Sequence, residues 1–123
     1  MLTVEDTAEH FDLTPGTIRS RIKTGELRAQ RINRQYRLAW EDVWACEKGP
    51  MPKGQRLERY RKPLMNKSSV AEKLRCSVKT IERMIRDGLP TRNVFGSVRI
   101  NPDDASDWVR ANLEFELAED WYV

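Results

Sequence analysis

The sequence has few of the residues from which active sites and metal centres are built. It contains two cysteines and one histidine. Cys46 and Cys76 have neither metal-site nor disulfide-framework spacing, which favours two reduced, partly buried thiols. No phosphate-binding loop or nucleophile motif is present, and His10 is expected at the surface of its helix. We therefore expect a protein that is not an enzyme and that has no metal or cofactor.

Long apolar segments are also missing. No apolar run reaches the ~18 residues of a membrane span. The N-terminus lacks the pattern of a secretory signal. We expect a protein of the bacterial cytoplasm or nucleoid that does not contact a membrane.

The charges are distributed unevenly along the chain. Residues 103–123 contain seven acidic residues and one basic residue, Arg110, which gives this segment a net charge of −6. Because the whole chain has a net charge of +3, residues 1–102 carry +9. This basic part is the expected contact surface for a polyanion, and the acidic end is expected to lie away from it.

One sequence pattern occurs twice. Residues 8–25 read AEHFDLTPGTIRSRIKTG and residues 71–88 read AEKLRCSVKTIERMIRDG. Equivalent residues are 63 positions apart, as for Thr17 and Thr80. Each copy has the form of two short helices joined by a tight turn. A repeated helix-turn-helix in a small basic chain indicates DNA binding by two modules.

Capping residues define the helices of the first copy. Thr3 is the expected N-cap of a helix over residues 4–11. Thr14 caps the second helix, where Pro15 occupies the first position, and Gly25 ends it. Isoleucines four residues apart face the core. The opposite face is short, polar and basic, as a DNA recognition helix requires, although a solvated surface would have the same composition. Its candidate DNA-binding residues are Gly16, Thr17, Arg19, Ser20 and Lys23.

A basic β-hairpin, or wing, is predicted over residues 27–38. Ile32 and Leu38 are the expected inward anchors, and residues 33–35 form the turn. The wing suits contact with phosphates or the minor groove, and the alternative is a solubilising hairpin. Its candidate DNA-binding residues are Arg31, Arg34 and Arg37. The tryptophans of a third helix, Trp40 and Trp44, are expected in the core or covering it.

The second copy repeats this arrangement with different surface residues. Asn66 or Ser68 caps its first helix and Ser77 caps the second. Glu82 either accepts a hydrogen bond from a cytosine amine or, as we favour, pairs with Arg86 within the helix. The second wing, over residues 92–100, is one residue shorter and has fewer arginines. The candidate DNA-binding residues of this copy are Lys79, Thr80, Arg83, Arg86 and Arg99.

The segments outside the two copies leave alternatives open. Residues 53–62 contain five basic residues and one acidic residue, and form either a solvated short helix or a basic strap along the DNA backbone. The acidic, aromatic tail either packs back between the modules as a helix or contacts a second copy or a partner protein. At helical spacing its stripe comprises Trp108, Ala111, Phe115, Ala118 and Tyr122.

The predicted fold is mainly α with small β-hairpin wings. It has two tandem winged helix-turn-helix modules, at residues 1–47 and 65–110. A basic linker over residues 48–64 joins them, and residues 111–123 form an acidic, aromatic C-terminal helix or tail. We expect a monomer or dimer in solution.

Short motifs in both copies resemble the excisionase-like, MerR-like winged helix-turn-helix family. In the first copy they are LTVEDTAE at residues 2–9, TPGTI at 14–18, KTGEL at 23–27, YRL at 36–38 and EDV at 41–43. In the second copy they are SVKTIERMI at 77–85, GLP at 88–90 and VRINPDD at 98–104. Ser20 stands where the motif usually has arginine, and Asn33 replaces the usual wing glycine. The tandem arrangement is a third departure.

The resemblance implies that the second helix of each copy enters the major groove and that the wing contacts the adjacent minor groove. The residues that would make these contacts are Arg19, Ser20, Lys23, Arg34 and Arg37 in the first copy and Lys79, Thr80, Arg83, Arg86 and Arg99 in the second. Family members include recombination directionality factors, small regulators and phage terminase small subunits.

The leading hypothesis is a sequence-specific binder of double-stranded DNA from a mobile element or phage. It would act as an excisionase, a transcriptional regulator, or both. The alternative is an assembly adaptor such as a terminase small subunit, which binds DNA and a protein partner. An integrase, a polymerase or a packaging protein is the candidate partner of the tail.

Overall fold

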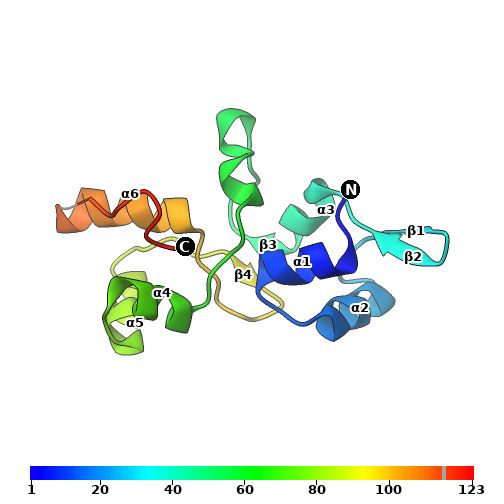
Figure 1. Cartoon of the computed structure of the whole chain (residues 1–123), viewed down its shortest axis with the longest axis horizontal. Helices are drawn as coiled ribbons and strands as arrows, with labels where there is room; N and C mark the ends of the chain where they lie inside the picture. Colours follow the sequence, from blue (N-terminus) through cyan, green and yellow to red (C-terminus); the bar gives the residue numbers. More distant parts are fainter. Residues whose placement is uncertain (115) are drawn as a thin grey trace. The chain divides into compact units, whose positions relative to one another are not determined.

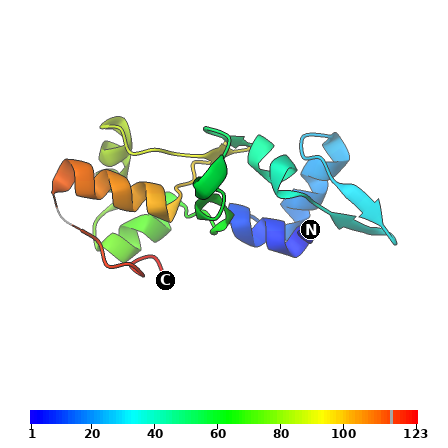
Figure 2. The ribbon, with the colours of Figure 1, turned by 90° about the horizontal axis from the view of Figure 1, so that it is seen from above.

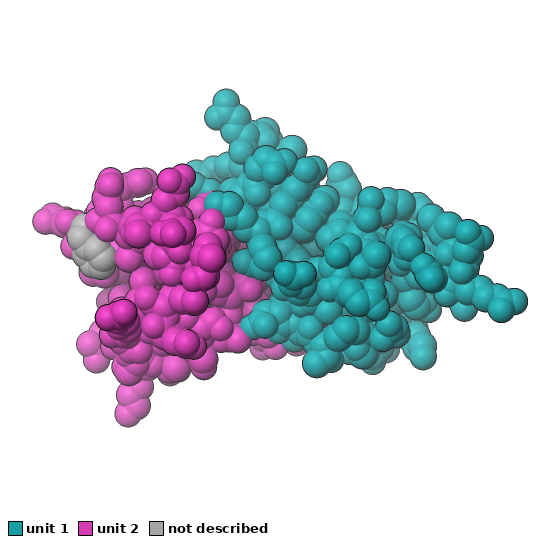
Figure 3. Space-filling view, viewed as in Figure 1, with its two compact units in different colours: residues 1–63 teal, residues 64–123 magenta. Residues whose placement is uncertain are grey.

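The computed structural model of the protein describes residues 1–114 and 116–123. The chain divides into two compact units, Met1–Pro63 and Leu64–Val123 (Figure 3). Both units are mainly helical, with small β-hairpins. No helix among the described residues is long and apolar enough to cross a membrane.

Unit 1 begins with two capped helices, α1 (Val4–Phe11) and α2 (Pro15–Thr24). Thr3 and Asp6 form a capping box, in which each backbone N–H donates to the other side chain at 3.0 Å. The hydrogen bond from the Thr3 backbone N–H, followed by the contribution of the Thr3 side chain, lowers the pKa of the Asp6 carboxyl. Thr14 caps α2 as predicted, and Gly25 ends it with a φ of 85°.

A tight turn between α1 and α2 sets their packing. Asp12 adopts a left-handed conformation with a φ of 55°, and its backbone N–H donates to the carbonyl groups at the end of α1. The chain therefore reverses within three residues. Phe11 and Ile18 meet in the core, where both side chains are fully buried.

The predicted first wing is an antiparallel hairpin of β1 (Gln30–Ile32) and β2 (Gln35–Arg37). The hairpin extends away from the helices of unit 1 (Figures 1 and 2). Its turn contains two residues, Asn33 and Arg34, which both have positive φ, whereas a three-residue turn was predicted.

The prediction that Ile32 is an inward anchor is wrong, because this side chain is 46% exposed. The outer end of the hairpin lies beyond the helices, so neither of its faces meets the core there. Leu38 at the base of the hairpin is fully buried as predicted, and its backbone pairs with Leu2.

The remainder of unit 1 packs around the tryptophans of α3 (Trp40–Ala45). Trp44 is buried and Trp40 stacks on it, which confirms their expected place in the core and its cover. The strand β3 (Glu47–Lys48) and two short 3-10 helices, η1 (Gly54–Arg56) and η2 (Arg59–Arg61), follow.

The segment predicted as a linker contributes to this core. Tyr60 is buried, and the Trp44 indole N–H donates to its carbonyl oxygen at 3.0 Å. The chain up to Pro63 therefore folds as part of unit 1.

His10 is buried, which corrects its predicted surface position. Its Nε2 lies 2.9 Å from Oε2 of Glu47, and the two side chains are 3% and 0% exposed. The imidazole also packs edge-on against Trp40. The sequence gives no sign of this contact, because the partner is 37 residues away and does not belong to the repeat.

Unit 2 begins with α4 (Lys67–Leu74) and α5 (Val78–Arg86). Asn66, rather than Ser68, caps α4, and Ser77 caps α5. Arg75 joins the two helices in the left-handed conformation, at the position equivalent to Asp12.

The segment predicted as the second wing, residues 92–100, contains less strand than the first hairpin. The strand β4 (Asn93–Val94) turns at Phe95 and Gly96, which both have positive φ, and Val94 then bridges to Ser97. The buried Ile100 follows and pairs with Met65 through two backbone hydrogen bonds.

The last helix, α6 (Pro102–Leu113), is capped by Asn101 and packs Ala105 and Trp108 against the core of unit 2. The helix ends at Leu113, earlier than predicted, because the backbone of Glu114 adopts the left-handed conformation with a φ of 55°. A longer helix would have placed further carboxylates at its negative end. The proposed stripe through Tyr122 therefore does not form, and its member Phe115 lies outside the described residues.

The tail folds back onto unit 2 as turns. Trp121 and Tyr122 pack against the core of this unit. The Trp121 indole donates to Ser106 Oγ at 2.8 Å, and Lys73 Nζ donates to the carbonyl oxygen of Val123 at 2.9 Å.

The buried pair of His10 and Glu47 gives a stability prediction. Replacing Glu47 by alanine removes the hydrogen-bond acceptor of the imidazole, whose other nitrogen has no partner among the described residues. We expect E47A to lower the free energy of unfolding by about 2 kcal/mol, measured by urea denaturation. The control is E9A, which removes an exposed glutamate from α1 and should change stability by less than about 0.5 kcal/mol. Equal stability of the two variants would contradict the structural role of this pair.

The Cys46 thiol gives a second prediction. Burial, followed by the negative charges of Glu47, Asp42 and Glu26, raises its pKa from 9.0 to about 11. At pH 8 the thiolate fraction then falls about a hundredfold, and the thiolate is the reactive species. Iodoacetamide should modify Cys46 about a hundredfold more slowly in the folded protein than in guanidinium, as followed by peptide mass spectrometry. Similar rates in both states would show that the thiol is not perturbed.

Candidate nucleic-acid interface

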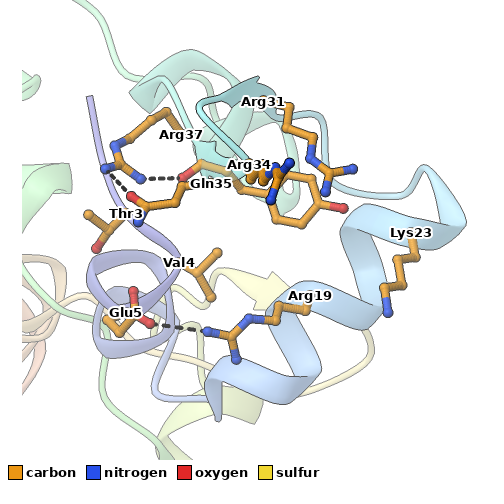
Figure 4. Close-up of a pocket in the computed structure, with 10 residues that line it drawn as sticks. Thr3, Val4, Glu5, Arg19, Lys23, Arg31, Arg34, Gln35 and Arg37 are labelled. Carbon is orange, nitrogen blue, oxygen red and sulfur yellow. Dashed lines mark hydrogen bonds and ion pairs between the residues drawn. The ribbon is translucent and has the colours of Figure 1, made fainter.

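A basic groove lies between α1, α2 and the hairpin of unit 1 (Figure 4). Its volume is about 450 Å³. Half of its lining residues are arginine or lysine, and one is acidic. The lining residues are Thr3, Val4, Glu5, Arg19, Lys23, Arg31, Arg34, Gln35, Tyr36 and Arg37.

The groove brings together five of the eight DNA-binding residues predicted in this unit. Figure 4 shows Arg19 and Lys23 on α2 and Arg31 and Arg34 on the hairpin, on opposite sides of the groove. Two segments separated in sequence therefore present one positive surface, which attracts a polyanion.

The other three predicted residues of unit 1 lie on α2 but do not line the groove. Gly16 and Ser20 are exposed, and a Cβ atom at Gly16 would meet only the Thr14 hydroxyl at 3.9 Å. They leave this face of α2, from its first turn to its middle, open to close approach. Thr17 is half-buried and bonds to Thr14 through its backbone N–H and its hydroxyl, so it contributes to the helix cap.

The cations of the groove differ in how strongly they are held. Arg19 forms an ion pair with Glu5 at 3.2 Å, but both side chains are about half exposed or more, at 49% and 66%. Such a pair contributes little to stability, so the guanidinium can exchange the carboxylate for a phosphate. Among the described residues, Lys23 and Arg34 form no ion pair.

The other two arginines are oriented by the hairpin itself. The Arg31 guanidinium lies over the Tyr36 ring, 5.8 Å from its centre. Arg37 donates to the carbonyl oxygen of Tyr36 and to the Gln35 side chain, both at 2.8 Å. These contacts are local to the hairpin and hold both side chains at the groove.

A separate ion pair secures the end of α2. Arg21 Nη1 donates to both carboxylate oxygens of Glu26 at 2.7 and 2.9 Å, and this lowers the pKa of Glu26. Thr24 also donates to this carboxylate. Arg21 is therefore engaged at the helix terminus and does not add to the charge of the groove.

Unit 2 has a corresponding groove of about 540 Å³. It contains three of the predicted DNA-binding residues, Lys79, Arg83 and Arg86, which are all exposed. The full lining is Lys67, Lys79, Glu82, Arg83, Ile85, Arg86 and Val98.

The remaining two predicted residues of unit 2 lie beside this groove. The backbone N–H and the hydroxyl of Thr80 bond to Ser77, as those of Thr17 bond to Thr14. Arg99 lines an adjoining hollow of about 450 Å³ and donates to the carbonyl oxygen of Val98.

Glu82 does not pair with Arg86 as predicted. Its Oε2 lies 3.7 Å from Nζ of Lys67, at the start of α4. The packing of α4 against α5 brings this lysine to the carboxylate, and a contact between helices could not be read from the spacing within α5.

Two charged residues that line the grooves, Glu5 and Lys67, were not predicted to do so. Lys67 is 63 positions after Val4, which lines the first groove. The offset between the two copies could therefore have identified Lys67 as a groove residue. Glu5 resembled an ordinary acidic residue of a first helical turn.

The described residues include no group of three histidine, cysteine or acidic side chains that could hold a metal ion. Burial also raises the pKa of the Cys76 thiol, so neither cysteine is a ready thiolate ligand. The positive charge of each groove supports non-covalent binding of an anion.

One family of known proteins matches part of the chain. Residues 1–43 match the family described as "Helix-turn-helix domain". No curated protein and no solved structure matches the chain. The matched residues include α1, α2 and the hairpin, and therefore every residue that lines the groove of unit 1. The match supports a helix-turn-helix family for this part of the chain, and a domain of this kind indicates DNA binding.

Proposed function

We propose that the protein binds double-stranded DNA sequence-specifically through two tandem winged helix-turn-helix modules, residues 1–47 and 65–110. The observation that carries this proposal is the groove of unit 1. Its five cations come from a helix and a hairpin that lie within the matched helix-turn-helix domain. Such a surface fits phosphates on both sides of a major groove that holds the helix.

In the proposed complex, α2 enters the major groove. Gly16 and Ser20 let its first turns approach the base edges, and Arg19 and Lys23 reach bases or phosphates. The hairpin then meets the adjacent backbone or minor groove through Arg31 and Arg34.

Unit 2 acts as the second module in this proposal. The N-caps of its helices, Asn66 and Ser77, occupy the positions equivalent to those of unit 1, and so does its left-handed turn residue. Three predicted DNA-binding residues, Lys79, Arg83 and Arg86, line its groove. The smaller second wing offers Arg99 as its cationic contact.

We assign the role of an excisionase or transcriptional regulator of a mobile element on the family resemblance. The alternative, an assembly adaptor, requires a tail that is available to a partner. Trp121 and Tyr122 pack against the core of their own unit, which favours the first role.

Charge removal tests DNA binding. The combined variant R19A/K23A/R83A/R86A removes four cations from the two helices. We expect its affinity at low salt to fall at least a hundredfold, measured on a duplex that the wild type binds. The slope of the logarithm of the binding constant against the logarithm of the salt concentration should become shallower by about 0.9 for each phosphate that the protein no longer neutralises. The control K48A/R110A removes two cations outside both grooves and should bind nearly as the wild type does. Undiminished binding by the fourfold variant would reject the proposal.

Footprinting tests whether both units bind. On a duplex that the wild-type chain binds, this chain should protect two separate patches from cleavage. R83A/R86A should protect only the patch of unit 1, and R19A/K23A only that of unit 2. Each double variant should bind about a hundredfold more weakly than the wild type, because tethering supplies a high effective concentration. A single patch that is the same for all three proteins would contradict the tandem arrangement.

A further inference from the structure

The outward faces of α2 and α5 differ, although the two helices are built alike. Their caps, Thr14 and Ser77, and their buried isoleucines, Ile18 and Ile81, correspond at the offset of 63. At three of the four equivalent exposed positions the chemistry differs, and only the last pair is basic in both helices. The equivalent pairs are Gly16 and Lys79, Arg19 and Glu82, Ser20 and Arg83, and Lys23 and Arg86.

Glu82 lies in the middle of the exposed face of α5. Lys79, Glu82, Arg83 and Arg86 follow the spacing i, i+3, i+4 and i+7, which places them on one side of a helix. All four are exposed, whereas Ile81 is fully buried. A helix that presents Arg83 to DNA therefore presents Glu82 as well.

The contact with Lys67 leaves the Glu82 carboxylate available. The two charged atoms are 3.7 Å apart, and the side chains are 32% and 50% exposed, so the pair is weak. The second carboxylate oxygen has no hydrogen bond among the described residues. Glu82 is thus loosely held at the groove and can accept a hydrogen bond.

The chemistry of the major groove restricts what a carboxylate can face. Phosphates and the base acceptors of guanine and thymine repel it, and only the exocyclic amines of cytosine and adenine donate there. In the major groove adenine presents an acceptor nitrogen beside its amine, whereas cytosine presents only its amine. Cytosine is therefore the base that Glu82 tolerates best.

Unit 1 presents the opposite charge at the equivalent position. Arg19 is a donor, and an arginine in the major groove pairs best with the two acceptors of guanine. Its neighbour Ser20 is short, whereas Arg83 in unit 2 is long. The two faces consequently fit different base sequences.

We propose that Glu82 is a specificity-determining residue that selects a cytosine in the half-site of unit 2, so that the DNA target consists of two unlike half-sites. This proposal rests on the proposed DNA-binding function. It deepens that function, because it specifies a base, a position in the fold and the asymmetry of the site.

The test compares the full-length wild-type chain with E82Q in selection from a random duplex pool, followed by titration of single-base variants. The wild type should enrich one C·G pair within the unit 2 footprint and bind about tenfold more weakly when that pair is changed. E82Q should discriminate there by no more than about twofold, or turn toward A·T, because a glutamine amide pairs with adenine. An unchanged preference for cytosine in E82Q overturns the proposal, as does wild-type selection of two identical half-sites.

Two further variants separate base contact from other effects of charge. E72Q removes an exposed carboxylate from α4 outside the groove and should keep the selection of cytosine. K67M removes the partner of Glu82 and should lower overall affinity while it also keeps the selection. Loss of cytosine selection in K67M would overturn the proposal, because Glu82 would then act only through its ion pair.

The possible results also distinguish failure of this proposal from failure of the proposed DNA-binding function. A wild-type chain that fails to bind any duplex rejects the proposed DNA-binding function itself. A chain that binds and selects two footprints, but whose base preference is insensitive to Glu82, rejects only the further inference. Thermal unfolding of E82Q, expected to match the wild type because the side chain is exposed, checks that the variant is folded.

Discussion

The tight turn within each helix pair is the constraint on which the rest of the structure depends. Asp12 and Arg75 both adopt the left-handed conformation without being glycine, which costs about 1 kcal/mol. Their backbone N–H groups satisfy carbonyl groups at the end of the preceding helix, which offsets this cost. Only with this reversal can the second helix of each pair bury its isoleucine and turn its polar face outward.

The basic groove of unit 1 follows from two local structures that are stable for different reasons. α2 is positioned by its cap and by the burial of Ile18, whereas the hairpin is positioned by its two-residue turn and by Leu38 at its base. The cap of α2 and the buried side chains of Ile18 and Leu38 do not involve the cations. The charges can therefore remain weakly paired, as the exposed Arg19–Glu5 contact illustrates, and available to a polyanion.

Local patterns in the sequence were sufficient to predict where the helices of the two copies begin, but not to predict contacts between distant segments. Thr3, Thr14 and Ser77 marked helix starts correctly, because an N-cap acts within three residues of itself. The five groove cations of unit 1 were also predictable from composition and spacing. Three features could not be predicted in this way: the burial of His10, the exposure of Ile32 and the partner of Glu82. They depend on how far the hairpin extends and on which segments pack side by side.

The buried contact of His10 with Glu47 affects how unit 1 can open. It joins α1 to β3 across 37 residues, so α2, the hairpin and α3 all lie inside a loop that this contact closes. Fraying of the hairpin leaves the loop intact, but separation of α1 from the rest of the unit does not. The helix proposed to read DNA therefore lies within a segment that opens cooperatively. The arginines of the hairpin can change conformation to meet a DNA backbone without opening this segment.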